Sequence, residues 1–425
     1  MSSRLRGSGL TPLEVAAGLA FGAPRRRGRR PRAGDPGTSA VEALEHAIAP
    51  ALERPPCLVS FSGGRDSSVV LAAAVRLARR LGLPEPVPAT NRFRRAPAAD
   101  ESDWQERVVA HLGLCDWHVV THDDELEAVG PYATDALRRH GLLWPFNVHF
   151  HAPLLAAARG GSLLTGIGGD EAFARSRWER ANDVLARRAR PAPRDALRVA
   201  LALAPVRLRA AHLRRSPTAT LPWLTPAGNA AVQRAWAAQA ASEPRDHAAR
   251  LVWWRALRPT RLGVASLALL AADAGAEIRH PLAAARFGAA LARELAGPPA
   301  REAALQRVFG PLLPEELYRR RTKAVFDEAF WGSAARGLAR DWQGEGADPS
   351  LVGHEALRRE WSRPVPDAHS FTLLQAAWLE REARGERRPA ASPPDRASAT
   401  SAGAATSGPE APPAAGARRD RPAGA

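Results

Sequence analysis

The sequence predicts an α/β fold, in which a parallel sheet lies between layers of helices and a helical region follows it. Three observations lead to this prediction. From about residue 41 to 170, short apolar runs suited to buried strands alternate with segments of helical periodicity. Two of these runs lead directly into a glycine-rich turn and the start of a helix. From about residue 171 onward, Ala, Leu, Arg and Trp recur at helical spacing, and strand signals are few.

Four strands and several helices are expected in the first region. The strands are Cys57–Phe61, Val87–Phe93, Trp117–Thr121 and Ser162–Thr165. The helices are Val69–Leu81, a segment carrying Trp104, Val108 and Leu112, and one near His151–Arg159. Glycines at 82 and 113 end the first two helices. Strands that alternate with helices favour a parallel sheet covered on both faces.

Composition divides the chain into four regions. Residues 1–40 are expected to form a short helix and a flexible linker, because residues 24–38 are rich in Arg, Pro and Gly. Residues 41–170 form the predicted α/β domain, and residues 171–385 the helical domain. Residues 386–425 contain almost no large apolar side chain, so we expect a disordered tail.

Bulk properties exclude several classes of protein. The chain has 425 residues, 45% of them hydrophobic, which is enough for two domains. Two cysteines are too few for a disulfide framework, which predicts a cytoplasmic protein. No apolar run approaches the roughly 20 residues that a bilayer requires, and we expect neither a secretory signal nor a membrane partner. The net charge of +16 comes from arginines that are spread along the chain without interleaved aromatic residues, so nucleic acid is not an expected partner.

The first glycine-rich turn, Ser62-Gly63-Gly64-Arg65-Asp66-Ser67-Ser68, directly follows the first strand. Glycines let the backbone approach an anion closely, and the start of a helix presents unpaired N–H groups to it. A bare phosphate would repel Asp66, so its presence indicates a bridging Mg²⁺. The turn therefore predicts a phosphate site, with an ordinary strand–turn–helix junction as the alternative.

The second turn, Thr165-Gly166-Ile167-Gly168-Gly169-Asp170-Glu171, follows the fourth strand and continues into Ala172 and Phe173. Loops at the carboxyl ends of parallel strands share one crevice. Asp66 and Asp170 are therefore expected to hold one metal site. By itself, this second segment could also be a simple glycine-rich turn.

The first turn resembles the PP-loop, SGGxDS, of the ATP pyrophosphatases, and not the Walker pattern. Together the two turns resemble the synthetase domain of asparagine synthetase, whose pattern is SGGxDS followed by SGxGxDE and an aromatic residue. Three weaker matches follow in the expected order: residues 100–113, the E-x-R-x-P segment with Glu277 and Arg279, and the R-x-K-x-x-F segment with Arg321 and Lys323. The resemblance extends from about residue 55 to 335.

This resemblance implies a PP-loop fold of the adenine nucleotide α-hydrolase type, with ATP and Mg²⁺ as cofactors. It implies a ligase that adenylates a small-molecule or peptide carboxylate and transfers it to ammonia or an amine. The implied catalytic residues are Asp66, Asp170, Glu171 and Lys323, with Asp66 and Asp170 binding metal and Glu277, Arg279 and Arg321 in support. The implied nucleotide-binding residues are Phe61, Ser62, Gly63, Gly64, Asp66, Ser67, Ser68, Thr165, Gly166, Gly168 and Gly169.

Lys323 is the only lysine of the chain. A compact ammonium enters a narrow site differently from a planar guanidinium, so a lysine in an arginine-rich chain indicates a position that arginine would not suit. The resemblance implies that Lys323 contacts the phosphates of ATP. A chance surface lysine is the alternative.

The chain also departs from the asparagine synthetases. It opens Met1-Ser2-Ser3 without their nucleophilic cysteine, so we expect no glutaminase activity in this chain and a possible need for a separate glutaminase or peptide-recognition partner. Ile167 stands where they carry a glutamate, and Arg65 where leucine is usual. Lasso-peptide cyclases and β-lactam synthetases vary at such positions, so a macrocyclase is one alternative function. A tRNA-modifying PP-loop enzyme and a catalytically degenerate binding partner are two others.

Overall fold

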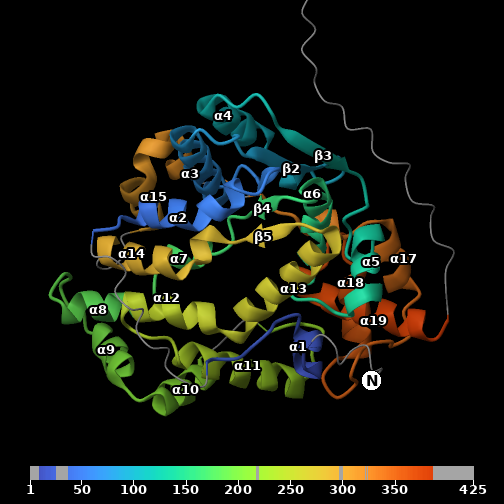
Figure 1. The fold of residues 1–425 in the computed structure, drawn as a ribbon. Coiled ribbons are helices and arrows are strands. Elements are labelled where there is room, and N and C mark those ends of the chain that lie inside the picture. The colour runs from blue at the N-terminus through green and yellow to red at the C-terminus, as the bar shows by residue number, and fades with distance from the viewer. Residues whose placement is uncertain are drawn as a thin grey trace, which may run out of the picture. The chain divides into compact units, whose positions relative to one another are not determined.

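A computed structural model describes residues 9–24, 37–216, 220–295, 300–320, 322 and 324–385. Five parallel strands form its sheet, in the order β3-β2-β1-β4-β5 (Figure 1). Their bounds are β1 Cys57–Ser60, β2 Val87–Phe93, β3 His118–His122, β4 Ser162–Leu164 and β5 Glu277–Arg279. β1 to β4 confirm the four predicted strands. β5 corrects the prediction of a purely helical second region, because Glu277–Arg279 pairs in parallel with β4.

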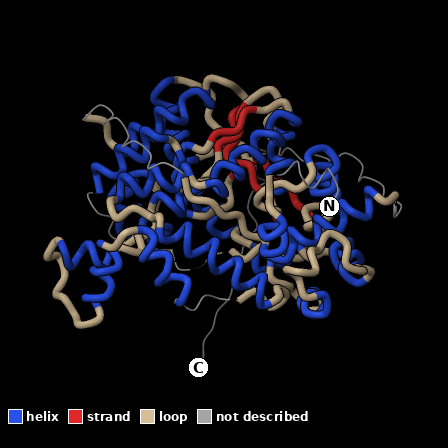
Figure 2. The backbone as a smooth tube through the Cα atoms, turned by 90° about the horizontal axis from the view of Figure 1, so that it is seen from below, coloured by secondary structure: helices blue, strands red, loops and turns tan. Residues whose placement is uncertain are grey.

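Alternate residues of the central strands face two different cores. Val59 and Leu164 belong to one apolar cluster, with residues of α2, α3, α14 and α15. Leu58 and Leu163 belong to another, with residues of α6 and α13. Successive side chains of a strand point to opposite faces of the sheet, so both faces of these short apolar strands are buried. The sheet therefore lies between two helical layers, as predicted, and the views in Figures 1 and 2 agree on this.

The helices of the first region are α1 Pro12–Ala17, α2 Ala40–Leu52, α3 Arg65–Leu81, α4 Ser102–Leu112, α5 Pro131–His140, α6 Ala152–Ala157 and α7 Gly169–Ala172. Those that follow are α8 Glu179–Leu185, α9 Asp195–Leu203, α10 Val206–Arg215, α11 Pro226–Ala241, α12 His247–Ala256 and α13 Arg258–Ala274. The last are α14 Ala285–Leu295, α15 Arg301–Phe309, α16 Glu315–Arg319, α17 Ser333–Arg340, α18 His354–Trp361 and α19 Phe371–Ala383. Short 3₁₀ segments are η2 Pro97–Ala99, η3 Val148–His151, η4 Pro281–Ala283, η5 Gly310–Leu312, η6 Asp327–Phe330 and η7 Ala368–Ser370.

The predicted helix at the N-terminal end is confirmed as α1. Thr11 caps it and forms a reciprocal capping box with Glu14, which satisfies two N–H groups of the first turn. Its Ala16 carbonyl accepts a hydrogen bond of 2.8 Å from the Trp223 indole, so α1 is attached to the second region. Among the described residues, no helix has both the length and the apolarity to cross a membrane.

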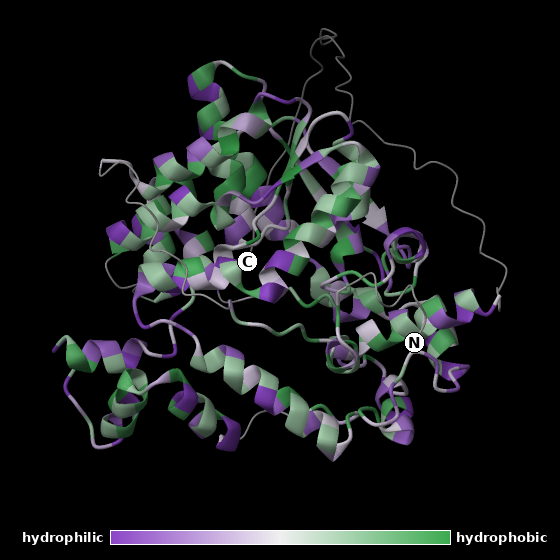
Figure 3. Ribbon diagram, turned by 60° about the horizontal axis from the view of Figure 1, so that its bottom comes forward, coloured by the Kyte–Doolittle hydropathy of each residue, from purple (hydrophilic) through white to green (hydrophobic). Residues whose placement is uncertain are grey.

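The helices of the second region differ among themselves in burial. Its helices mix hydrophilic and hydrophobic residues along their length (Figure 3), and α10 buries none of its residues. A further apolar cluster joins Trp223, Trp331 and Phe371, the first residue of α19. The predicted boundary at residue 170 stays a prediction, as does the tail, since residues 386–425 lie outside the described residues.

The order of the strands fixes where a ligand site can form. From β1 the chain adds β2 and then β3 on one side, whereas β4 and β5 lie on the other side of β1. Connections that leave neighbouring strands in opposite directions open a crevice at the carboxyl ends of those strands. β1 and β4 are these neighbours, and each runs directly into one of the two glycine-rich turns.

Candidate functional site

The first turn joins β1 to α3 through residues 61–64. Gly63 has φ +78°, and a Cβ on it would lie 2.9 Å from Cγ of Gln105. Both facts favour glycine at this position. The hydroxyls of Ser67 and Ser68 donate to the Gly64 carbonyl at 3.1 and 2.8 Å, which fixes the first turn of α3. The helix begins at Arg65, four residues before the predicted start, because the motif itself forms its first turn.

The second turn packs directly against the first. A Cβ on Gly166 would lie 2.8 Å from the Ser67 nitrogen, and one on Gly169 would lie 2.2 Å from the Asp66 carboxyl carbon. Any larger residue at position 169 would therefore collide with the Asp66 carboxylate. The two glycines let the loops after β1 and β4 touch, as the predicted shared crevice requires.

One guanidinium joins the two aspartates that the loops carry. Nη2 of Arg301 donates to both carboxylate oxygens of Asp66 at 2.7 Å, and its Nη1 lies 2.6 Å from an oxygen of Asp170. Burial raises the pKa of Asp66, the positive charge of Arg301 opposes that rise, and the nearby Asp170 adds to it. Asp66 and Asp170 thus converge on one cation, at the place where the sequence predicts a metal.

These two carboxylates suit Mg²⁺. Magnesium is usually bound through one or two carboxylates, with phosphate oxygens and water as the other ligands. The described residues contain no cluster of three or more His, Cys, Asp or Glu that could hold a metal without a substrate. The arginine already placed between Asp66 and Asp170 demonstrates that the pair accommodates a positive charge.

Two further arginines are close to the phosphate site that the first turn predicts, one within the turn and one in contact with it. Arg65 is half-buried, and its pKa is lowered by burial and then by the positive charge of Arg301. Arg320 donates to the Gly63 carbonyl at 3.0 Å and forms a buried ion pair with Glu101. Neither residue has a role that the sequence motifs predict. The one signal for Arg320 is its place directly before the R-x-K-x-x-F segment.

The other predicted residues of the second turn have separate environments. The Thr165 hydroxyl lies 2.7 Å from Nδ1 of His280, whose pKa burial lowers to about 4. Burial raises the pKa of Glu171. The Glu171 carbonyl accepts a hydrogen bond of 3.1 Å from Arg250, which attaches α12 to this loop. Ile167 packs against the apolar cluster of β4, β5 and α13.

Two of the predicted supporting residues, Glu277 and Arg279, form an ion pair with each other. Glu277 pairs with Arg279 at 2.5 Å and with Arg54 at 3.4 Å. Its neighbour in the sheet is Ser162, the first residue of β4, so Glu277 lies at the amino end of the strands. Arg321 and Lys323 lie outside the described residues. On either side of Lys323, the Arg320 side chain contacts Gly63 and the Val325 N–H donates to the Ala98 carbonyl at 2.9 Å.

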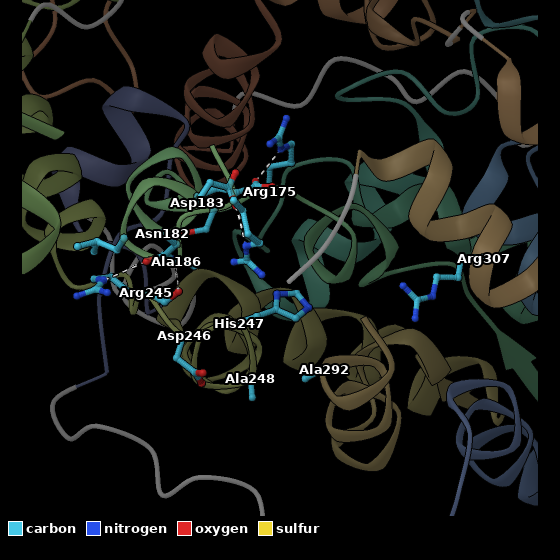
Figure 4. A pocket seen from close by; sticks show the side chains of 14 residues that line it. Arg175, Asn182, Asp183, Ala186, Arg245, Asp246, His247, Ala248, Ala292 and Arg307 are labelled. Carbon is cyan, nitrogen blue, oxygen red and sulfur yellow. Dashed lines mark hydrogen bonds and ion pairs between the residues drawn. The ribbon is translucent and has the colours of Figure 1, made fainter. Parts of the chain in front are cut away.

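A cavity of about 980 Å³ lies between α8, α12 and the ends of α14 and α15 (Figure 4). Arg175 pairs with Glu179 across its wall, and His247 also lines it. Neither ring nitrogen of His247 has a hydrogen-bond partner among the described residues, and burial lowers its pKa to about 4. No residue of the two glycine-rich turns lines this cavity, and its first lining residue, Arg175, follows Asp170 by five positions in the chain.

Comparison with known proteins agrees with this geometry. The family model described as asparagine synthase matches residues 40–397, which include both turns and all five strands. No curated protein matches the chain. With most of its length matched, the chain belongs to the asparagine synthase family, whose members are ATP-dependent synthetases that form amide bonds.

Proposed function

We propose that this chain is an AMP-forming carbon–nitrogen ligase. A carboxylate oxygen attacks the α-phosphorus of ATP, the bond from that phosphorus to the bridging oxygen breaks, and pyrophosphate leaves. The nitrogen of ammonia or an amine then attacks the acyl carbon, AMP leaves with the electrons of the acyl–oxygen bond, and the nitrogen loses a proton. The observation that carries the proposal is the convergence of Asp66 and Asp170 on one cation between two glycine turns.

The residues of the first turn would bind the phosphates. The N-terminus of α3 directs unpaired N–H groups and the positive end of the helix dipole to the crevice. Arg65 adds a cation from the same turn, and Arg320 holds the Gly63 carbonyl in place through a hydrogen bond. A Mg²⁺ held by Asp66 and Asp170 would neutralise charge on the phosphate oxygens. Such fixed charges stabilise phosphoryl transfer without moving during the reaction.

Lys323 is the proposed contact to the departing pyrophosphate. This assignment is supported by hydrogen bonds on both sides of Lys323. Arg320 donates to Gly63 of the first turn, and the Val325 N–H donates to the Ala98 carbonyl. A lysine acts as a point charge, which suits an anion whose oxygens rearrange as the bond breaks.

We assign the acid to the cavity lined by Arg175 and His247, because its first lining residue follows Asp170 by five positions. Its volume of about 980 Å³ is at the upper end of the range for ligand sites. This observation supports the alternative function, in which a peptide or natural-product carboxylate is adenylated and an amine of the same molecule closes a ring. The net charge of +16 suits a tRNA-modifying enzyme and Ile167 suits a degenerate binding partner, but neither alternative accounts for the convergence of Asp66 and Asp170 on one cation.

The test is ATP–pyrophosphate exchange with purified protein. The candidate acids are aspartate and peptides that carry an aspartate or glutamate side chain. Asp66→Asn and Asp170→Asn should each lower exchange by at least about 100-fold, because a fixed charge next to the phosphates is lost. Asp135→Asn removes an exposed carboxylate paired with Arg139 on α5 and is the matched control.

Each outcome separates the candidates. Exchange only with the peptides would favour the ring-closing function. Full exchange in either aspartate variant would refute the proposed site. Salt-sensitive tRNA binding without exchange would favour the tRNA-modifying alternative, and a folded protein that neither exchanges nor binds ATP would favour a binding partner.

A further inference from the structure

Arg301 occupies the centre of the candidate site, although the family motifs do not include it. Its two Nη atoms make three contacts of 2.6–2.7 Å with the carboxylates of Asp66 and Asp170. The Asp66 side chain is 20% exposed and that of Arg301 is 25% exposed. A carboxylate so far removed from water is costly without a partner, so the guanidinium stabilises Asp66 when nothing else is bound.

Apart from Glu302, which follows it in the helix, two features near Arg301 disfavour a positive charge at this position. Arg301 is the first residue of α15, where the helix dipole is positive. The pKa of Arg65 is lowered first by burial and then by the positive charge of Arg301, so the two guanidinium groups repel each other. The two aspartates are therefore the groups that hold Arg301 in place. If another cation neutralises them, the attraction is lost and the repulsions remain.

We propose that Arg301 is an exchangeable cation, which holds Asp66 and Asp170 before the nucleotide binds and then moves from the carboxylates to the pyrophosphate oxygens. This inference rests on the proposed function for the identity of the anion. A guanidinium and a divalent cation cannot both lie in contact with the same two carboxylates without strong repulsion. The first N-terminal turn of α15 and the adjacent Arg65 provide a positive surround in which phosphate oxygens are favoured.

The exchange predicts opposite effects of one substitution on two ligands. Without nucleotide, Arg301 competes with a divalent cation for the aspartates, so its removal should strengthen binding of that cation. With the cation already bound, Arg301 contributes attraction to pyrophosphate, so its removal should weaken binding of that anion. A residue that only maintains the fold would weaken both.

The experiment measures Mn²⁺ binding by electron paramagnetic resonance without nucleotide, and binding of inorganic pyrophosphate by calorimetry at saturating Mg²⁺. We expect Arg301→Ala to bind Mn²⁺ at least about 10-fold more tightly than the wild type and pyrophosphate at least about 10-fold more weakly, as the loss of charge-assisted hydrogen bonds implies. Arg139→Ala is the control, because it removes an exposed arginine of α5 that pairs with Asp135 at 2.8 Å. It should leave both affinities unchanged.

Unchanged or weaker Mn²⁺ binding by Arg301→Ala would overturn the exchange, and so would unchanged pyrophosphate binding. Arg301→Gln keeps polar atoms at this position and should shift both affinities in the same directions, which covers the case in which the alanine variant does not fold. Failure of the proposed function has a different signature. The wild type would then show no ATP–pyrophosphate exchange, while the Mn²⁺ comparison would still report whether Arg301 competes for the aspartates.

Discussion

The buried pair of Glu101 and Arg320 offers a direct test of how the first turn is supported. The Glu101 side chain is 7% exposed and that of Arg320 is 3% exposed. Arg320 also donates to the Gly63 carbonyl at 3.0 Å. In Glu101→Gln this guanidinium would keep its charge in a buried place without a carboxylate. We therefore expect the turn to lose both stability and its fixed geometry.

The cost can be worked out from the burial of the pair. Removing one partner of a buried ion pair destabilises a protein by about 3–5 kcal/mol. The unit that contains the pair spans residues 1–387. At about 2.1 cal/mol/K of unfolding entropy per residue, this loss corresponds to a decrease in Tm of about 4–6 °C. ATP affinity should decrease as well, because the Gly63 carbonyl loses its orientation.

Calorimetry measures both quantities, Tm from a thermal scan and ATP affinity from titration. Glu106→Gln is the matched control, because it lies on α4, the helix that Glu101 directly precedes, and its side chain is 60% exposed in a pair with Arg92 at 3.3 Å. An exposed pair contributes about 0–1 kcal/mol, so its Tm should change by no more than about 1 °C. If Glu101→Gln unfolds within 1 °C of this control, the reasoning about the turn is wrong.

Three other substitutions give definite expectations. Gly169→Ala should abolish exchange, because its Cβ would lie 2.2 Å from the Asp66 carboxyl carbon, whereas Gly263→Ala in α13 meets nothing nearer than 3.6 Å and should keep full activity. Burial raises the pKa of Glu127 to about 7, so folding favours the protonated acid and its contribution to stability decreases by about 3 kcal/mol as pH rises from about 4.5 to 7. Denaturant titrations of Glu127→Gln should lack this decrease, and an identical pH profile in both proteins would contradict the assignment. Lys323→Arg should lower exchange at least about 10-fold despite its unchanged charge, and normal exchange would show that any cation serves there.

The sequence contains enough information for the sheet and its two loops. Strands such as Cys57–Ser60 are short apolar runs followed by a glycine-rich turn, and both of these signals lie in the local sequence. β5 has no such signal. Only Ile278 of its three residues is apolar, and the strand exists because it pairs with β4. A pattern of one apolar residue between Glu277 and Arg279 is equally compatible with a loop.

The same limit applies to the residues around the aspartates. Asp66 and Asp170 follow glycines at strand ends, so their roles can be predicted from local sequence and topology. Arg301 and Arg320 belong to none of the motifs, and the chain contains many arginines from which they cannot be singled out. Their contacts join residues more than 200 positions apart, as Arg301 to Asp66 and Arg320 to Gly63 show. Such pairs become visible only when the helices are placed on the sheet.

Ile167 shows how a departure from the family pattern can be absorbed by the fold. Its side chain packs against the apolar cluster that contains Leu163 and Ile278, so it faces the core between β4, β5 and α13. A glutamate in this orientation would place a charge among apolar side chains, at a cost of several kcal/mol. The loop instead uses Thr165, whose hydroxyl accepts from the Ile167 N–H at 3.3 Å and lies 2.7 Å from His280. The side of the loop that carries Asp170 keeps its acidic residue, whereas the side at Ile167 has become part of the core. We therefore expect Ile167 to affect recognition of the acid and to leave the residues proposed for phosphate chemistry in place.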